Sequence, residues 1–116
     1  MSKLLQQIVD DLDKFLAIFP SDIKGRLEQD PDIKDLIEVV LDLGREIEAR
    51  FYKKTVVFEG RFTTEEDLNY IIARVGEFSG DKRAGIERTL HRISAIENRH
   101  GRIIGLTCRV GRAVLG

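Results

Sequence analysis

Apolar residues recur along this chain with two periods, and each period predicts a different kind of element. Between residues 4 and 16, leucine, isoleucine and phenylalanine return every three or four positions, which predicts an amphipathic helix of about four turns. Pro20 is expected to end this helix, and Ser21 to cap a short second helix whose middle Gly25 weakens. Asp30-Pro31-Asp32 then predicts a turn.

The following residues alternate between apolar and polar side chains, the pattern of strands packed on a core. Three strands are expected: Leu36–Leu43 with Ile37, Val39, Leu41 and Leu43 on its core face, a strand with Ile47, Ala49 and Phe51 on its core face, and Thr55–Phe58.

A helical period returns after the third strand, and the chain ends in a second alternating region. Thr63 or Thr64 is expected to cap a helix whose first turn is acidic, as the helix dipole favours. The remaining expected elements are the core stripe Leu68, Ile71, Ile72 and Val75 of that helix, a short helix over residues 82–90, and a hairpin of Arg92–Glu97 and Arg102–Val110 joined by Asn98–Gly101.

This order of elements predicts an α+β fold in which helices cover one face of an antiparallel sheet. With 116 residues the chain has the size of one domain. Within it we distinguish an N-terminal helical segment, residues 1–34, from an α+β domain, residues 35–116.

The composition indicates in which cellular compartment the protein is expected. No apolar run approaches the ~20 residues of a membrane span, and the first residues lack the features of a secretory signal peptide. Cys108 is the only cysteine, which excludes an intramolecular disulfide and fits a reducing compartment. Its apolar surroundings predict a buried strand thiol. We therefore expect a cytoplasmic protein.

Charge is divided unevenly along the chain. Residues 82–116 carry eight basic side chains, seven of them arginine, against two acidic ones, whereas residues 1–81 carry eleven basic and eighteen acidic side chains. Arginine binds phosphate and carboxylate in a fixed fork, so this segment could face an anion. A solvated basic face paired with the acidic half explains the same pattern equally well.

Catalytic motifs are missing from the sequence. No glycine-lysine pair exists, so there is no phosphate-binding loop, and no Ser-His-Asp or Cys-His set has a recognisable spacing. His91 and His100 are expected at a strand edge and in a turn, without catalytic roles, and no metal site is indicated. These observations favour a binding or oligomerisation domain without catalytic residues.

Four segments carry a resemblance to a known family: Ile37–Arg45, Arg74–Asp81, Arg83–Ile96 and Gly105–Val114. Together they resemble the cyanobacterial and plastid relatives of the stage III sporulation protein AA ATPase, which are P-loop ATPases. A wider likeness is to the N-terminal domains of secretion and pilus-retraction ATPases, which are PAS-like α+β sheets. The resemblance implies that an ATPase core, with ATP and magnesium, follows residue 116 in a parent protein, while this chain holds no cofactor itself. It also implies the plastid stroma as the compartment if the gene is encoded in a plastid.

The same resemblance implies a non-catalytic accessory or oligomerisation domain in a ring ATPase. Its partners would be its own ATPase core and the neighbouring subunits of a homo-oligomer. Arg92, Arg109 and Arg112 would face phosphate or nucleotide in the assembly, and Arg83, Arg88 and Arg102 would form a further anion patch. Two alternatives stay open: an electrostatic module that binds single-stranded nucleic acid weakly, and a structural domain that docks a partner.

Overall fold

The computed structural model describes residues 11–112. Helical residues 11–16 come first. The elements that follow are helix α2 (Ser21–Glu28), a 3-10 turn (Ile33–Asp35), strands β1 (Leu36–Asp42), β2 (Glu46–Phe51) and β3 (Thr55–Phe62), helix α3 (Glu65–Ile72), and strands β4 (Arg83–Gly85), β5 (Arg92–Glu97) and β6 (Ile103–Arg109).

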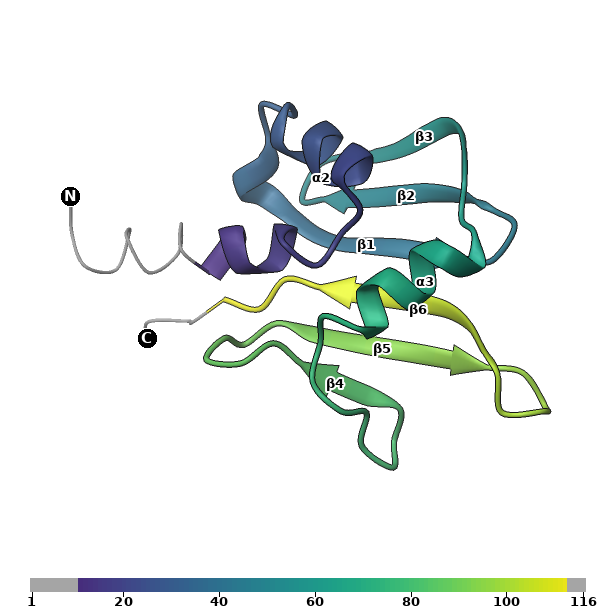
Figure 1. Cartoon of the computed structure of the whole chain (residues 1–116). Coiled ribbons are helices and arrows are strands. Elements are labelled where there is room, and N and C mark those ends of the chain that lie inside the picture. Colours follow the sequence, from purple (N-terminus) through teal and green to yellow (C-terminus); the bar gives the residue numbers. More distant parts are fainter. Residues whose placement is uncertain (1–10, 113–116) are drawn as a thin grey trace.

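The six strands form one antiparallel sheet in the order β3-β2-β1-β6-β5-β4. Two hairpins build β1–β2–β3, and α3 then carries the chain to the far edge, where β4 begins the return (Figure 1). The last strand, β6, closes the sheet by pairing with β1. The sheet thus consists of two three-stranded halves, β1–β2–β3 and β6–β5–β4, which meet at its centre.

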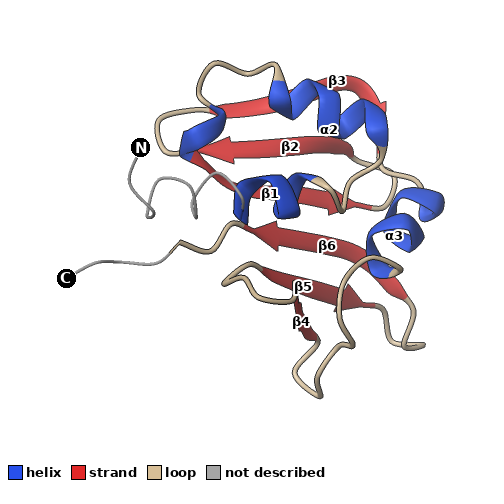
Figure 2. Cartoon of the chain, turned by 60° about the vertical axis from the view of Figure 1, so that its left-hand side comes forward, coloured by secondary structure: helices blue, strands red, loops and turns tan. Residues whose placement is uncertain are grey.

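Within residues 11–112, the helices lie over one face of this sheet (Figure 2). The helical residues 11–16, α2 and α3 contribute large apolar side chains to a core shared with the strands. Fully buried members of this core include Phe15, Phe19, Ile23, Leu27, Leu36, Val39, Leu41, Ile47, Leu68, Ile71, Ile93 and Leu106. Because the described residues of the N-terminal helical segment enter the same core as the sheet, the two parts pack as one unit.

An ion-pair network fastens α2 and α3 to the edge of the sheet. The Arg61 guanidinium lies 2.6 Å from an Asp22 carboxylate oxygen and 2.7 Å from one of Asp67. Asp67 and Thr64 also form a capping box at the start of α3. Burial raises the pKa of Asp67, but the hydrogen bonds from Arg61 and Thr64 outweigh burial and leave this pKa below its usual value.

Much of the predicted order of elements is confirmed, including the α+β class, the antiparallel sheet and the helices on one face. Ile47, Ala49 and Phe51 are buried as expected, as are Leu68 and Ile71 of the predicted stripe, while Ile72 and Val75 are partly buried against the core. Residues 4–10 of the expected first helix lie outside the described residues.

The predicted helix over residues 82–90 is wrong. Arg83–Gly85 is the edge strand β4, and an irregular loop follows it. Lys82 and Arg88 have positive φ angles of 65° and 62°, which no right-handed helix accommodates. Ala84 pairs with Ile93 and is buried, so sheet pairing stabilises this segment more than its weak helical pattern could.

Three local predictions also need correction. A β-bulge between Leu36 and Glu38 breaks the alternation, so Leu36 and Val39 are both buried, and Ile37 and Leu43 lie outside the core. The third strand runs to Phe62, four residues further than expected. The α2 N-cap is Pro20, with no side-chain cap, and Ser21 is the first helical residue.

No helix among residues 11–112 is both long and apolar enough to cross a membrane.

Candidate functional site: the open face of the sheet

The second face of the sheet carries no helix among the described residues, and we refer to it as the open face (Figure 2). Successive residues of a strand point to opposite faces, so the residues between the core positions line the open face. On the β4–β5–β6 half these include Arg83, Ser94, Ile96, Thr107 and Arg109, and on the β1–β2–β3 half Glu38, Val40, Asp42, Glu48 and Val57.

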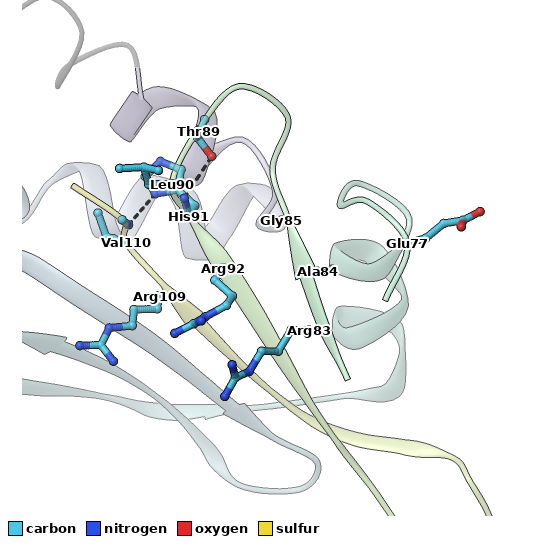
Figure 3. Close-up of a pocket in the computed structure, with 11 residues that line it drawn as sticks. Glu77, Arg83, Ala84, Gly85, Thr89, Leu90, His91, Arg92, Arg109 and Val110 are labelled. Carbon is cyan, nitrogen blue, oxygen red and sulfur yellow. Dashed lines mark hydrogen bonds between the residues drawn. The ribbon is translucent and has the colours of Figure 1, made fainter. Parts of the chain in front are cut away.

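Three arginines gather on the β4–β5–β6 half, and we call Arg83, Arg92 and Arg109 the arginine cluster. Arg92 lies directly opposite Arg109 in the β5–β6 register, and Arg83 pairs with Ser94 on the neighbouring strand. Figure 3 shows the three guanidinium groups extending in the same general direction from adjacent strands. They line a hollow of about 440 Å³, bounded at its other end by the loop that ends in Thr89 and Leu90.

The arginine cluster is poorly neutralised within the chain. Arg83 has a carboxylate oxygen of Asp81 at 3.8 Å. Neither Arg92 nor Arg109 forms an ion pair with any described residue. Like charges directly opposite each other on a sheet are destabilising. This arrangement can bind an anion, because the exposed guanidinium groups of Arg92 and Arg109 stand together with no ion pair to a described carboxylate, and the Asp81 carboxylate interacts with Arg92 only at longer range.

Glu38 is the carboxylate best placed to neutralise Arg109, since the two residues are partners in the β1–β6 register. Its ion pair is instead with Arg50, at 3.8 Å, on the opposite neighbouring strand. Arg50 also lies 3.4 Å from Glu48. Arg50 of the β1–β2–β3 half is therefore paired within that half.

The β1–β2–β3 half of the open face is acidic and has a hollow of about 520 Å³, which we call the acidic hollow. Its lining includes three carboxylates, Asp42, Glu46 and Glu48, two arginines, Arg45 and Arg50, and the apolar side chains of Val40, Val57 and Phe62. Phe62 is 54% exposed, high for an aromatic ring. The acidic hollow thus combines an apolar surface with a net negative charge.

Gly105 lies at the boundary between the two halves. A Cβ atom there would be 2.7 Å from Oδ1 of Asp42 and 3.6 Å from Cδ1 of Ile96. The missing side chain leaves the Asp42 carboxylate room to lie over β6, beside the basic half. The charge changes sign between adjacent strands further along the sheet, where Glu38 of β1 lies opposite Arg109 of β6.

The buried ring of His91 lies beneath the end of the arginine-cluster hollow and holds the neighbouring backbone in place. Its ring is buried, packs edge-on against Phe15, accepts a hydrogen bond at Nδ1 from the Gly111 N–H at 2.9 Å, and contacts the Asp11 carbonyl oxygen through Nε2 at 2.5 Å. These partners select the neutral tautomer protonated at Nε2. Burial lowers the pKa of His91, which also favours the neutral ring. His91 therefore has a structural position.

The other arginines of the predicted site lie elsewhere. Arg112 donates a hydrogen bond to the Lys34 carbonyl oxygen, and burial lowers its pKa. Arg102 forms an ion pair with Glu65 of α3. Arg88 is an exposed residue of the loop between β4 and β5. Of the six arginines that the sequence singled out, the structure brings together Arg83, Arg92 and Arg109.

The described residues offer little for catalysis or metal binding. No group of three or more histidine, cysteine, aspartate or glutamate side chains within residues 11–112 could hold a metal ion. Cys108 is fully buried, and burial raises the pKa of its thiol well above the usual range. The predicted buried strand thiol is thus confirmed, and such a thiol does not act as a nucleophile at neutral pH.

The sequence reasoning did not single out the acidic hollow. Its signal was present, because Glu46, Glu48 and Arg50 alternate with the core residues Ile47 and Ala49. Charged residues between core positions are ordinary on any solvated strand, however. Only the sheet order, which joins this half to the arginine-bearing half, gives these charges a possible role.

Several known proteins are similar to this chain along most of its length. The chain is 56% identical over 109 residues to "Uncharacterized protein ycf45" of Porphyra purpurea, covering 94% of this chain and 19% of that protein. It is 50% identical over 106 residues to "Protein SEEDLING PLASTID DEVELOPMENT 1" of Arabidopsis thaliana, covering 91% and 16%. A ycf45 protein of Cyanidium caldarium is 43% identical over 109 residues, covering 94% and 32%. No protein-family model and no solved structure matches the chain.

These similarities contradict the predicted family. Nearly the whole chain aligns with proteins whose names mention neither an ATPase nor sporulation or secretion, and no family model supports such a membership. The assignment to relatives of the stage III sporulation protein AA ATPase, and the role as an accessory domain of a ring ATPase, are therefore wrong. The expected likeness to proteins of plastids agrees with the name of the Arabidopsis relative.

The chain spans between 16% and 32% of the length of these relatives. Whatever the remaining parts of those proteins do is therefore not transferred to this chain.

Proposed function

We propose that this chain is a non-catalytic binding domain whose open face docks an anionic group of a macromolecular partner. The observation that carries the proposal is the pair Arg92 and Arg109, opposite each other in the sheet and without an ion pair among the described residues. An acidic group of a partner would give both guanidinium groups the charge-assisted hydrogen bonds that the chain itself does not supply.

A protein partner suits this face better than a nucleic acid. The acidic hollow adjoins the arginine cluster and would repel a phosphate backbone that continued across the sheet. The exposed large apolar side chains on β5 and in the preceding loop are Ile96 and Leu90, so this half presents no aromatic ring on which a base could stack. Acidic side chains of a protein can occupy the cluster while basic ones face the acidic hollow.

Binding to two anionic probes tests the proposal. Fluorescence anisotropy in dilute solution should detect a labelled polyglutamate peptide that binds weakly and is released by salt. Arg92→Gln with Arg109→Gln should weaken this binding at least ~10-fold, because a hydrogen bond to a charged group contributes ~1.5–3 kcal/mol and ~1.4 kcal/mol is a factor of ten.

The matched control removes the same charge from turns at the ends of the sheet. Lys53→Gln with Arg99→Gln should leave polyglutamate binding unchanged; an equal loss in both double variants would show that net charge alone governs binding. An oligothymidylate of equal charge is the second probe. Tighter binding of this probe that survives ~0.2 M salt would favour the nucleic-acid module instead.

We place this function in the plastid stroma, or in the cytoplasm of an organism without plastids. The support is the name of the Arabidopsis relative, which refers to plastid development. The finer likeness of the fold to PAS domains also remains a proposal, supported by helices on a single face of an antiparallel sheet.

A further inference from the structure

Polar side chains form a regular grid on the open face of β4, β5 and β6. Arg92 of β5 lies opposite Arg109 of β6, and the next positions of these strands on the same face, Ser94 and Thr107, also lie opposite each other. Arg83 of β4 is the partner of Ser94 on its other side. Three guanidinium groups therefore border two hydroxyl groups on an area three strands wide.

The hydrogen-bond donors of this grid are available to a ligand. Arg92 and Arg109 form no ion pair among the described residues. The hydroxyl groups of Ser94 and Thr107 form no hydrogen bond with any residue of the range 11–112. Both side chains are short and half-buried, so they form a floor beside the longer, exposed arginines.

The charge of the grid matches a doubly negative ligand. Its three guanidinium groups have one described carboxylate in an ion pair, that of Asp81, which lies 3.8 Å from Arg83 and accepts a hydrogen bond from the Ser79 hydroxyl. Glu77 also lines the neighbouring hollow, but Figure 3 shows its carboxylate directed away from the arginines. A phosphoryl group on a side chain carries a charge of about −1.5 to −2 at pH 7 and three acceptor oxygens, whereas a carboxylate carries one charge and two oxygens.

We propose that Arg83, Arg92, Arg109, Ser94 and Thr107 form a phosphoryl site, which binds a phosphorylated side chain of a protein partner. The arginine forks bind the phosphoryl oxygens from the sides, and the hydroxyl groups donate from the floor. This inference rests on the proposed binding function and names the anionic group.

The positive area is too small for a run of phosphates. Beyond Arg109 its row of the sheet continues with Glu38 of β1, and beyond Thr107 the next row continues with Val40 and then Glu48. A nucleic-acid backbone that crossed the strands would meet these carboxylates. Among the described residues that line the adjoining hollow, no exposed aromatic ring is available to a base. A single phosphoryl group therefore fits this area better than a nucleic acid or a nucleotide.

Exposed apolar side chains stand on both sides of the phosphoryl site along β5. Leu90, 62% exposed, lines the arginine-cluster hollow two residues before Arg92, and Ile96, 49% exposed, follows two residues after Ser94. An extended peptide rises ~3.3 Å per residue. A peptide that lies along β5 with its phosphorylated residue over the site would thus place its residues ~3 positions before and after near Leu90 and Ile96. These contacts favour a protein partner over a free phosphate ion.

Three labelled peptides test the phosphoryl assignment. Each has about seven residues, a leucine at each end and small polar residues between, and the central residue is phosphoserine, glutamate or serine. Fluorescence anisotropy should show that the phosphoserine peptide binds at least ~10-fold tighter than the glutamate peptide, because its additional charge and oxygen support at least one more charge-assisted hydrogen bond. The serine peptide should bind most weakly. Equal binding of the phosphoserine and glutamate peptides would overturn the assignment.

Removal of the hydroxyl groups tests the floor of the site without any change of charge. Ser94→Ala with Thr107→Val should weaken binding of the phosphoserine peptide about 10-fold. Thr55→Val, which removes an exposed hydroxyl group at the far edge of the sheet, is the matched control and should leave this binding unchanged. Unchanged affinity in the double variant, with its fold retained by circular dichroism, would overturn the site as drawn. If the double variant does not fold, Ser94→Ala alone makes the same test.

Removal of the arginine charges tests the sides of the site. Arg92→Gln with Arg109→Gln should reduce the affinity of the phosphoserine peptide to that of the serine peptide, whereas Lys53→Gln with Arg99→Gln should leave it unchanged. If the phosphoserine and glutamate peptides bind equally and both require Arg92 and Arg109, the phosphoryl assignment is wrong and the proposed binding function stands. If the arginine pair affects no peptide, both are wrong.

Two competitors distinguish the sources of a phosphoryl group. Inorganic phosphate should displace the labelled phosphoserine peptide only at concentrations at least ~10-fold above those of the same peptide without its label, because it lacks the contacts with Leu90 and Ile96. Equal potency would mean that the site binds the free ion, and would overturn the assignment to a protein partner. An oligothymidylate that competes better than the phosphoserine peptide would overturn it in favour of a nucleic acid.

Discussion

The two halves of the open face balance their charges differently. In the β1–β2–β3 half, Arg50 contacts Glu38 and Glu48, and the Glu46 carboxylate accepts a hydrogen bond from the Gly60 N–H at 2.7 Å. In the β6–β5–β4 half, Arg92 and Arg109 lie opposite each other and form no ion pair among the described residues. A sheet that needed only to be solvated would not require two unpaired arginines in register. This comparison is the reason why we propose that the basic half carries the binding function.

The two halves of the sheet share one hydrophobic core. We therefore expect a substitution in that core to have the largest effect on the free energy of unfolding. Leu106 of β6 is fully buried and lies opposite Leu41 of β1, where the halves meet. Leu106→Ala should lower the free energy of unfolding by ~2–5 kcal/mol, because it leaves a cavity that both halves line. Thr107→Ala, one residue along on the open face, is the matched control and should change it by less than ~0.5 kcal/mol. Denaturant unfolding measures both. Two separate transitions would mean that the halves fold independently.

The attachment of the helices distinguishes the acidic half further. Arg61 on β3 holds Asp22 of α2 and Asp67 of α3. Arg61→Met should cost about 1–3 kcal/mol, because it leaves the nearly buried Asp67 carboxylate without its charged partner. The pKa of Asp67 is lowered in the folded chain, so its contribution is present above the unfolded value of 3.8 and is lost as pH falls through the folded pKa. An unchanged acid unfolding midpoint in Arg61→Met would contradict this role.

The basic half has its own buried titrating group, His91. The pKa of this ring is lowered from 6.5, so the neutral ring stabilises the fold above pH 6.5. This contribution should be lost as pH falls from about 6.5 to the folded pKa, where protonation at Nδ1 would face the Gly111 N–H. His91→Gln should be less stable than the unmodified chain at neutral pH and lose the dependence on pH below 6.5. Thermal melts at several pH values measure the difference, and a parallel dependence in both proteins would refute it.

Sequence periodicity predicted the elements that bury an uninterrupted apolar stripe. The strand of Ile47, Ala49 and Phe51 and the helix carrying Leu68 and Ile71 follow this rule, because their periods match the geometry of each element. The wrong predictions concern segments whose structure is determined by strand pairing or by backbone conformation. Neither the bulge after Leu36 nor strand β4, whose neighbours Lys82 and Arg88 have positive φ angles, has a periodic signal.

The candidate site was predictable only in part. The excess of arginine after residue 81 indicated an anion-binding segment, but it could not separate Arg92 and Arg109 from Arg112, which the fold uses to bind the Lys34 carbonyl. That distinction requires the register of β5 and β6. The juxtaposition of a basic and an acidic half depends on β6 pairing with β1, a contact between residues far apart in the sequence.

The smallest expected effect tests why the arginine pair exists at all. Arg92→Gln removes one of two like charges that face each other across β5 and β6. If the isolated chain gains nothing from the pair, this substitution should raise the free energy of unfolding by ~0.2–1 kcal/mol, the size of a cross-strand charge effect. The measurement is made on the isolated chain in dilute solution, where no binding partner is present. Arg50→Gln on the acidic half is the control and should lower stability by at most ~1 kcal/mol, because it removes exposed ion pairs. A gain at Arg92 together with weaker partner binding would mean that the basic half is kept at a cost to stability, as binding sites often are. A loss at Arg92 equal to that at Arg50 would instead make both arginines structural and remove the difference between the halves.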